Sequence, residues 1–402
     1  MLKHIELSEA VRIMEQQPAY PGTEQLALPA CLGRILAEDC MARLSIPPFD
    51  KSPFDGYAYR TADAPARLRV VGTAAAGCRE LPEIHAGETL RIFTGAPIPP
   101  GADAVVRQED AEPDGETVMI RQRAESGTNI IREGEDLKAG EMLLAAGTTL
   151  VPSHLGLLAS QGIDRLTVYR RPLALLIPTG TELSEPGRER SRYGIYNSSS
   201  YVLAAYLEKI GFCVRRCGIV PDDPDALLAA TRAALESDAD VVFTTGGASV
   251  GDYDFAGSTA RALGLERVFW KVNVKPGGAL LVSRYGSKLL LNLSGNPAAA
   301  LMSLLVILRP WLEKMCGARR QEDEMVLPAF EEMPKTSSAT RLLRGHLHIS
   351  DGRAWFREHQ GRGNGNIASF SGCELIGIVP GNSGPVKAGT PVRTLRLPPW
   401  LL

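Results

Sequence analysis

The sequence predicts an α/β protein of several domains: a doubly wound, mostly parallel sheet domain, an inserted β domain, a helical and extended domain, and a C-terminal β-barrel. Three observations predict it. Apolar strands alternate with helices between residues 173 and 318, as in sheets that are covered on both faces. Short strands separated by Gly and Pro fill residues 47–140 and 322–402. The length of 402 residues suits two to four domains of roughly 100–200 residues each.

The helical and extended domain is expected to combine residues 1–46 with residues 141–172. An amphipathic helix opens the chain, with Ser8 as its cap and with Val11 and Met14 at helical spacing. A second, short helix is expected at Ser153–Ser160. Because residues 47–140 separate the two stretches, we treat them as an inserted domain.

The inserted β domain, residues 47–140, has short apolar runs separated by Pro and Gly. A turn at Glu112-Pro113-Asp114-Gly115 is expected to join the last two strands as a hairpin. The expected strands are Leu68–Val71, Leu90–Phe93, Ala104–Arg107 and Val118–Arg121.

The doubly wound domain, residues 173–318, carries clear helix signals. Gly211 ends one helix, and Asp223-Pro224 begins the next, because Asp caps a helix and Pro suits its first turn. The expected strands are Leu173–Ile177, Cys213–Val220, Val241–Thr245, Val268–Val274, Leu280–Ser283 and Leu289–Leu293, and the expected helices include Ser198–Ile210, Phe255–Leu263 and Pro297–Cys316. A charged linker then leads to the expected barrel, residues 322–402.

The composition excludes several classes of protein. Hydrophobic residues make up 44% and charged residues 22%, which excludes a wholly disordered chain. The net charge of −2 argues against general nucleic-acid binding. Seven cysteines without a Cys-x-x-Cys pair are expected to be free thiols in a reducing compartment. With no signal peptide recognised and no apolar run of the roughly 20 residues that span a membrane, we expect a cytoplasmic protein without membrane contact.

Four expected strands of the doubly wound domain end in loops rich in Gly, Pro, Ser and Asp. In open α/β sheets, ligands bind at the carboxyl ends of the strands. Glycines expose main-chain N–H groups, so a phosphate or another oxyanion is the expected ligand. An ordinary tight turn would explain any one loop, but it explains four at one edge poorly. The loops are Pro178–Leu183, Thr245–Asp254, Lys275–Gly278 and Ser294–Pro297.

Charged residues beside these loops could hold an anion and a metal. Lys271 and Lys275 would face one side of a strand; a solvated face is the alternative, but the neighbouring loop favours a functional pair. Asp252 and Asp254 would fall on one face of an extended loop and are candidate metal ligands, since carboxylates beside phosphate are typical of Mg²⁺ sites. Asp222 is the freer carboxylate of the Asp222-Asp223 pair, because Asp223 fits the helix cap. Helix capping is the alternative for Asp254.

Seven segments, in this order, resemble the MoeA family of molybdopterin molybdenumtransferases, which includes the E domain of gephyrin. They span nearly the whole chain and are highly specific. They are PPFDKSPFDGYA (residues 47–58), FTGAPIPPGADAVV (93–106), GEDL with AAGTTL (134–150), PTGTEL (178–183), TTGGASVGDYD (244–254), KPGG (275–278) and SGNPAA (294–299).

The resemblance implies an elongated homodimer of four-domain protomers with shared active sites. It also implies a reaction of molybdenum cofactor biosynthesis, in which adenylylated molybdopterin and molybdate are the substrates. With a divalent cation, Mg²⁺, AMP leaves and molybdenum enters the dithiolene of the pterin. A molybdopterin adenylyltransferase could deliver the substrate.

The matching motifs imply a role for each of their functional positions. The implied catalytic residues are Asp55, Asp136, Glu182, Asp222, Lys271 and Lys275. The implied substrate-binding residues are Thr94, Thr245, Gly246, Gly247, Ser249, Gly277, Ser294 and Asn296, together with Arg344 and Ser369 for molybdate. The implied metal ligands are Asp254 and Asp222.

Three residues depart from the usual pattern of the family. Thr181, Gly278 and Ser294 stand where Asp, Lys and Pro are usual, and Gly278 removes a charge that could hold molybdate. Two alternatives therefore stay open: a paralogue specialised for tungstate, and a non-catalytic protein that binds molybdopterin or its cofactor or scaffolds partners. A nucleotide-processing enzyme that shares only the doubly wound domain is a third, against which the matching β domain argues.

Overall fold

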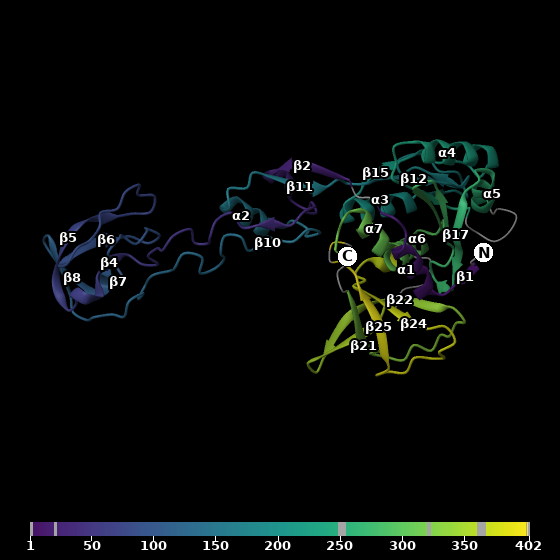
Figure 1. Ribbon diagram of the computed structural model, residues 1–402. Coiled ribbons are helices and arrows are strands. Elements are labelled where there is room, and N and C mark those ends of the chain that lie inside the picture. Colours follow the sequence, from purple (N-terminus) through teal and green to yellow (C-terminus); the bar gives the residue numbers. More distant parts are fainter. Residues whose placement is uncertain are drawn as a thin grey trace. The chain divides into compact units, whose positions relative to one another are not determined.

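The computed structural model describes residues 3–19, 22–247, 255–319, 323–359, 367–398 and 400. The chain forms two compact units, and many of their elements are labelled in Figure 1. The first unit comprises Met1–Ala37, Gly147–Val151 and Leu166–Leu402, and the second comprises Glu38–Ala146 and Pro152–Arg165. No helix within the described ranges has the length and apolar character needed to cross a membrane.

A seven-stranded sheet forms the centre of the first unit (Figure 1). Its order is β1-β17-β19-β20-β16-β12-β15, and only β19 runs antiparallel to its neighbours. The sheet is therefore mostly parallel, as expected, but mixed. Its strands are β1 (Lys3–Ile5), β12 (Leu173–Pro178), β15 (Cys213–Arg216), β16 (Val241–Thr245), β17 (Glu266–Val272), β19 (Leu281–Tyr285) and β20 (Lys288–Leu293).

Helices cover both faces of this sheet. Successive residues of a strand point to opposite faces, and here they enter two different apolar cores. Phe243 points into the main core, whereas its neighbour Val242 points into the core beneath α4. The main core is covered by α1 (Leu7–Glu15), α3 (Ser199–Ile210) and a long helix made of α6 (Pro297–Ser303), a π-helical turn (Leu304–Leu308) and α7 (Arg309–Met315). The other face carries α4 (Pro224–Glu236) and α5 (Phe255–Ala262).

Local sequence signals set several helix ends as expected. The Asp223 carboxylate accepts the Ala226 N–H at 2.8 Å and caps α4. Gly211 ends α3 with a φ of 112°, which glycine tolerates. The expected closing helix contains a π-helical turn, Leu304–Leu308, that ends two residues before Pro310, whose ring would clash within a regular α-helical turn.

The first residues of the chain differ from the expectation. Lys3–Ile5 pairs in parallel with β17, and α1 packs on the main core. Ser8 lies inside α1 and does not cap it, because the helix begins at Leu7 with Glu6 at the cap position. Three residues are too few to show a strand pattern, which is why β1 was missed. In the following stretch, β2 (Thr23–Ala27) pairs with β11 (Arg165–Tyr169).

The C-terminal sheet is an open half-barrel, where a closed barrel was expected. Its order is β18-β22-β24-β25-β21, with β23 beside β22, so the sheet retains two ends. Phe356 and Leu375 belong to its own core, whereas Leu342 and Ile376 face the main core. The strands are β18 (Val274–Lys275), β21 (Glu324–Pro328), β22 (Thr340–Ser350), β23 (Arg353–Glu358), β24 (Leu375–Val379) and β25 (Pro391–Arg396).

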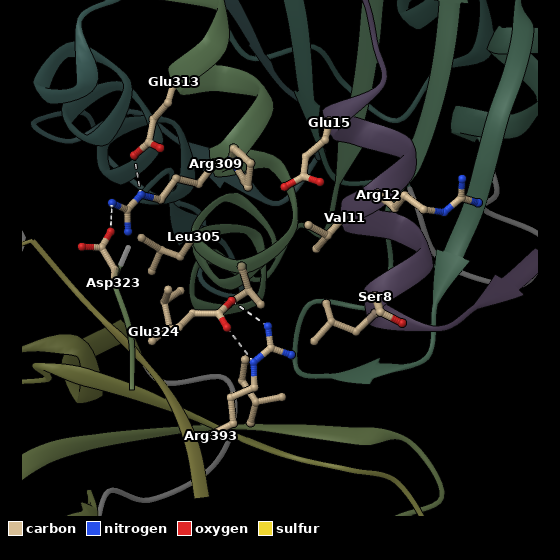
Figure 2. A pocket seen from close by; sticks show the side chains of 15 residues that line it. Ser8, Val11, Arg12, Glu15, Leu305, Arg309, Glu313, Asp323, Glu324 and Arg393 are labelled. Carbon is tan, nitrogen blue, oxygen red and sulfur yellow. Dashed lines mark hydrogen bonds and ion pairs between the residues drawn. The ribbon is translucent and has the colours of Figure 1, made fainter. Parts of the chain in front are cut away.

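A cavity of about 640 Å³ lies between α1, the long helix and the half-barrel (Figure 2). Charged residues on its wall pair with one another. Arg309 binds Glu313 at 2.6 Å and also binds Asp323, and Arg393 binds Glu324 through two hydrogen bonds. Arg309 is only 7% exposed, and its pair with Asp323 joins the long helix to the segment that enters the half-barrel.

The second unit contains a six-stranded sheet of order β7-β4-β6-β5-β9-β8. Its hairpin turn is shorter than expected: Glu112 and Pro113 belong to β8, and the chain reverses at Gly115-Glu116. The strands are β4 (Gly56–Tyr59), β5 (Ala66–Ala74), β6 (Glu88–Ile92), β7 (Ala104–Arg107), β8 (Ala111–Asp114) and β9 (Thr117–Ile120). The same unit holds β3 (Cys40–Met41), β10 (Met142–Leu144) and α2 (Pro152–Ser160).

Changing Ile5 to Ala tests the docking of β1. The Ile5 side chain is 5% exposed and belongs to the main core, so its loss should lower the free energy of unfolding by about 2–5 kcal/mol. Urea denaturation followed by circular dichroism measures this change. Arg12→Ala, on the exposed side of α1, is the control and should change the free energy by less than about 0.5 kcal/mol. Equally small changes in both variants would contradict the docking.

Candidate active site

Three of the four Gly-rich loops meet at the carboxyl edge of the seven-stranded sheet, because they follow the neighbouring parallel strands β12, β16 and β20. The Thr179 N–H donates to the Thr245 carbonyl at 2.9 Å. The Gly246 N–H donates to the Leu293 carbonyl at 3.1 Å. The loops that begin at residues 178, 245 and 294 are therefore in direct contact.

Glycine is required at residue 246, where the first and second loops touch. A Cβ on Gly246 would lie 2.6 Å from the Thr179 carbonyl oxygen, and one on Gly295 would lie 3.4 Å from the Gly246 Cα. Gly246 and Gly247 also have φ angles of 103° and 64°. Three further sequence-predicted residues of the second loop, Ser249, Asp252 and Asp254, lie outside the described residues.

Asp222 and Thr181 hold each other beside the first loop. The Thr181 N–H donates to Oδ2 of Asp222 at 3.2 Å, and the Asp222 N–H donates to Oγ1 of Thr181 at 3.0 Å. The next residue, Glu182, is exposed and folds back, so that a Cβ on Gly180 would lie 2.6 Å from its Oε2. The carboxylate of Asp222 is therefore fixed at the carboxyl edge.

Ser294 and Asn296 shape the third loop. Oδ1 of Asn296 accepts the Ala299 N–H at 3.0 Å and caps α6, and Oγ of Ser294 accepts the Asn296 N–H at 3.2 Å. The Ser199 hydroxyl, at the start of α3, donates to the Gly295 carbonyl at 3.0 Å. These two predicted site residues thus have a structural role at the edge.

The fourth loop joins the site through α6. The Gly277 carbonyl accepts the Ser303 hydroxyl at 2.7 Å, and Gly277 has a φ of 95°. The two lysines beside this loop, Lys271 and Lys275, do not lie on one continuous strand, so this expectation was wrong. Lys271 has a φ of 65° near the end of β17, and Lys275 lies in β18, which belongs to the half-barrel.

In the half-barrel, Arg344 of β22 is 9% exposed, and its guanidinium lies 5.5 Å from the ring of Phe370. Burial lowers the pKa of Arg344. Ser369 belongs to the short helical turn Ile367–Phe370, but its side chain lies outside the described part of the structure.

The second unit brings Asp55 and Thr94 together. The main-chain N–H and the hydroxyl of Thr94 both donate to Oδ1 of Asp55, each at 2.8 Å. The Thr94 N–H is the main reason that the pKa of Asp55 is lowered, and the hydroxyl is the second. Asp136 lies exposed in a loop, where its N–H donates to the Ile46 carbonyl at 2.9 Å.

Two arginines beside Asp55 were not predicted from the sequence. The Arg91 guanidinium lies 5.4 Å from the ring of Tyr57 and 5.3 Å from that of Phe93, and that of Arg107 lies 3.9 Å from the ring of Phe54. The alternation of residues along each strand could not predict these arginines. Their strands, β6 and β7, lie on either side of β4 only in the folded sheet.

The donor set fits a metal that is bound together with a substrate. Among the described residues, no group of three or more His, Cys, Asp or Glu could hold a metal ion by itself. Asp222 supplies one fixed carboxylate at the edge. Mg²⁺ is commonly held by one or two carboxylates together with substrate phosphates and waters, so the residues present are compatible with it.

Comparison with known proteins agrees with the fold and with the motifs. Residues 5–162 match the family model of the MoeA N-terminal region (domain I and II), and residues 176–314 match that of a probable molybdopterin binding domain. Two structures of a molybdopterin biosynthesis MoeA protein from Pyrococcus horikoshii have TM-scores of 0.86 and 0.83. Both are 27% identical, cover 99% and 98% of this chain, and are themselves covered completely.

Two curated relatives share the whole length. The molybdopterin molybdenumtransferase of Staphylococcus aureus (strain COL) is 32% identical over 394 residues, which cover 96% of this chain and 94% of the relative. The protein of the same name from Bacillus subtilis (strain 168) is 33% identical over 419 residues, which cover 98% of this chain and 94% of the relative. The expected resemblance is thereby confirmed, and the chain belongs to the molybdopterin molybdenumtransferase family.

Proposed function

We propose that this chain inserts molybdenum from molybdate into adenylylated molybdopterin, with Mg²⁺-dependent release of AMP, in molybdenum cofactor biosynthesis. The observation that carries the proposal is the direct contact of the three Gly-rich loops beside the fixed carboxylate of Asp222. The full-length likeness to relatives named molybdopterin molybdenumtransferase supports the reaction class.

The arrangement suits a substrate that carries phosphate. Gly246 and Gly247 line a small pocket at the sheet edge together with Thr179 and Asn292. Asp222 and Asp254 would hold Mg²⁺, which neutralises the charge that develops on phosphate oxygens as AMP leaves. Thr181 keeps the Asp222 carboxylate in place throughout.

We propose roles for the remaining residues according to the loop or strand in which each one lies. Glu182, Lys271 and Lys275 would act on the phosphate and the oxyanion. The proposed pterin pocket is made of Thr245, Gly246, Gly247, Ser249, Gly277, Ser294 and Asn296, while Arg344 and Ser369 are the sequence-based candidates for molybdate.

We further propose that the active form is a homodimer with shared sites in the cytoplasm. Asp55, Thr94 and Asp136 would then act on substrate that is bound by the partner subunit. All seven cysteines are free thiols, which is typical of a reducing compartment. A molybdopterin adenylyltransferase is the proposed source of the substrate.

Gly278 is the residue that favours a second candidate, a paralogue specialised for tungstate. A Cβ on Gly278 would lie 2.5 Å from the Val272 carbonyl oxygen and 2.6 Å from the Val274 carbonyl oxygen. The loop therefore has no room for a lysine. A non-catalytic, cofactor-binding protein is the remaining alternative, and the reciprocal Asp222–Thr181 pair argues for the enzyme.

The deciding experiment measures AMP release from adenylylated molybdopterin with Mg²⁺ and either molybdate or tungstate. Asp222→Asn should lower the rate about 100–1,000-fold, because the charge that holds the metal is lost. Thr181→Val should lower it about 10–100-fold, because the hydroxyl that accepts the Asp222 main-chain N–H is lost and the segment that carries the carboxylate is no longer held. Asp225→Asn, exposed in the first turn of α4, is the matched control. Absence of AMP with both oxyanions would refute the enzyme.

The pH dependence tests Asp55. Its lowered pKa keeps the carboxylate ionised to a lower pH than that of a free Asp, and activity that needs the ionised form is lost as the pH falls through this pKa. Thr94→Val removes the hydroxyl bond, so the pKa should rise and the acid limb of kcat/KM for AMP release should move to higher pH. Thr128→Val in the same unit is the control, and an acid limb that stays in place would rule out this role.

Mixed dimers test the shared site. Asp55→Asn and Asp222→Asn protomers, each inactive alone, should regain about a quarter of the wild-type rate per site when equal amounts are unfolded and refolded together, since about half of the dimers are then mixed and each mixed dimer contains one intact site. AMP release before and after mixing measures the gain. Mixed dimers that remain inactive would show that the two carboxylates serve the same protomer.

A further inference from the structure

One face of the six-stranded sheet in the second unit carries Arg91 next to Asp55. The strand β4 lies between β6 and β7 (Figure 1). Arg91 of β6 stands opposite Tyr57 of β4, and residues that stand opposite each other in paired strands project to the same side. Asp55 lies two residues before Tyr57, so its side chain follows the same alternation. In agreement with this placement, the charge of Arg91 acts on the Asp55 carboxylate and lowers its pKa.

The Arg91 guanidinium is held in a fixed orientation. Its Nη1 donates to the Tyr57 hydroxyl at 2.8 Å, and its Nη2 donates to Oε1 of Gln108 at 3.3 Å. The rings of Tyr57 and Phe93 lie 5.4 and 5.3 Å from the guanidinium, which is the range of cation–π contacts. Gln108 is itself tied to the site, because its main-chain N–H donates to the Asp55 carbonyl at 3.0 Å. An arginine that is already held in this way loses little freedom when it binds a ligand.

The charge of Arg91 is left without a counter-charge from the protein. On the neighbouring strand β5, Arg67 and Arg69 each bind a carboxylate, that of Asp114 and that of Glu88. Arg91 forms no ion pair with any residue that the structure describes, and its two hydrogen bonds go to neutral groups. Its other N–H groups have no protein partner in the same ranges. Because Arg91 is only half-buried, a ligand from solvent can reach them.

Asp55 has a carboxylate oxygen available beside this cation. Both bonds from Thr94 go to Oδ1, and Oδ2 accepts no hydrogen bond within the described part of the chain. The Thr94 bonds are the larger causes of the lowered pKa of Asp55, and the charge of Arg91 adds to them. The carboxylate is therefore ionised at neutral pH and by itself would repel a phosphate group. A fixed cation at its side offsets this repulsion.

Arg107 of β7 is a comparable arginine on the opposite face. It stands opposite Gly56 of β4, one residue before the residue that faces Arg91, and successive strand residues project to opposite sides. Its guanidinium lies 3.9 Å from the ring of Phe54 and is exposed. Its charge is not among those that act on the Asp55 carboxylate. Arg107 therefore serves as a control of the same residue type with the same kind of aromatic contact.

We propose that Arg91 is a substrate-binding residue that holds a phosphate group of adenylylated molybdopterin beside Asp55. The inference rests on the proposed function, since it names a further residue for the same substrate. The planar guanidinium presents its remaining N–H groups to phosphate oxygens, a geometry that arginine offers and lysine does not. Phosphate is favoured over a stacked ring of the ligand, because the protein itself supplies the rings of Tyr57 and Phe93 to the guanidinium.

The test first measures substrate binding without turnover. Full-length wild-type protein and its variants are titrated calorimetrically with adenylylated molybdopterin, while Mg²⁺, molybdate and tungstate are left out. Arg91→Met should weaken binding about 10–100-fold, the factor for a lost hydrogen bond to a charged group. Arg91→Lys keeps the charge without the planar geometry and should bind more tightly than Arg91→Met but more weakly than the wild type. Arg107→Met should bind as the wild type does.

A double variant separates binding from stability. Tyr57 is 3% exposed, so Arg91→Met leaves its buried hydroxyl without the Arg91 bond and should lower Tm. Tyr57→Phe combined with Arg91→Met removes this hydroxyl. The double variant should therefore unfold at a higher temperature than Arg91→Met and bind the substrate no better. Tyr57→Phe alone keeps the guanidinium and should retain most of the affinity.

Steady-state AMP release adds a second readout. A contact made equally in the bound substrate and in the transition state raises KM and leaves kcat unchanged, and this is the result expected for Arg91→Met. An Arg91→Met variant that binds as the wild type does would overturn the proposal. An equal loss in Arg107→Met, an Arg91→Lys variant no better than Arg91→Met, or a double variant that regains affinity together with stability would also overturn it. So would a wild-type protein that does not bind the substrate.

The outcomes distinguish this inference from the proposed function. Substrate binding that depends on Arg91 in a protein that releases no AMP would support the site and refute the enzyme. AMP release with an unchanged KM in Arg91→Met would refute the site and leave the enzyme in place.

Discussion

The close approach of main-chain segments at one sheet edge is the constraint on which the site depends. Gly246 can lie against the Thr179 carbonyl only because it has no side chain, and Gly295 in turn lies against Gly246. The bonds of Thr179 and Gly246 to the neighbouring strands extend the sheet beyond its regular strands. The parallel order of β12, β16 and β20 brings the three loops together, and glycine lets them touch.

The elements that could be predicted from the sequence are those with local causes. Asp223 and Gly211 mark helix ends through interactions within a few residues, and β16 is recognisable because both of its faces are covered. β1 could not be predicted, since its three residues become a strand only by pairing with β17. The break after Val272 was missed for the same reason: the chain leaves one sheet for another there, and β18 pairs with a strand whose residues come more than 60 positions later.

In the candidate site, too, the features with local causes could be predicted, and those that depend on distant residues could not. The strand-end motifs were sufficient to place Thr245, Gly246 and Ser294 near one another, because parallel strands share their carboxyl edge. The partner of Asp222 was not predictable, since Thr181 reaches it across 41 residues of sequence. The cores that Arg341 and Arg344 face were not predictable either, because a strand pattern does not show which core each face of β22 meets until the neighbouring strands are known.

Asn273, at the point where the chain leaves the seven-stranded sheet, is bonded on both sides of the junction. Its N–H donates to the Ile5 carbonyl at 2.8 Å, its side chain donates to Glu6 at 2.8 Å, and its carbonyl accepts the Thr340 N–H at 3.0 Å. A single residue thus ties the start of the chain to the first residue of β22. The half-barrel cannot slide along the sheet without breaking these bonds, and the chain between Asn273 and the fourth loop is too short to absorb such a shift. A movement of the half-barrel would therefore also move the fourth loop, Lys275–Gly278. The same movement would strain the hydrogen bonds that Asn273 makes to Ile5 and Glu6.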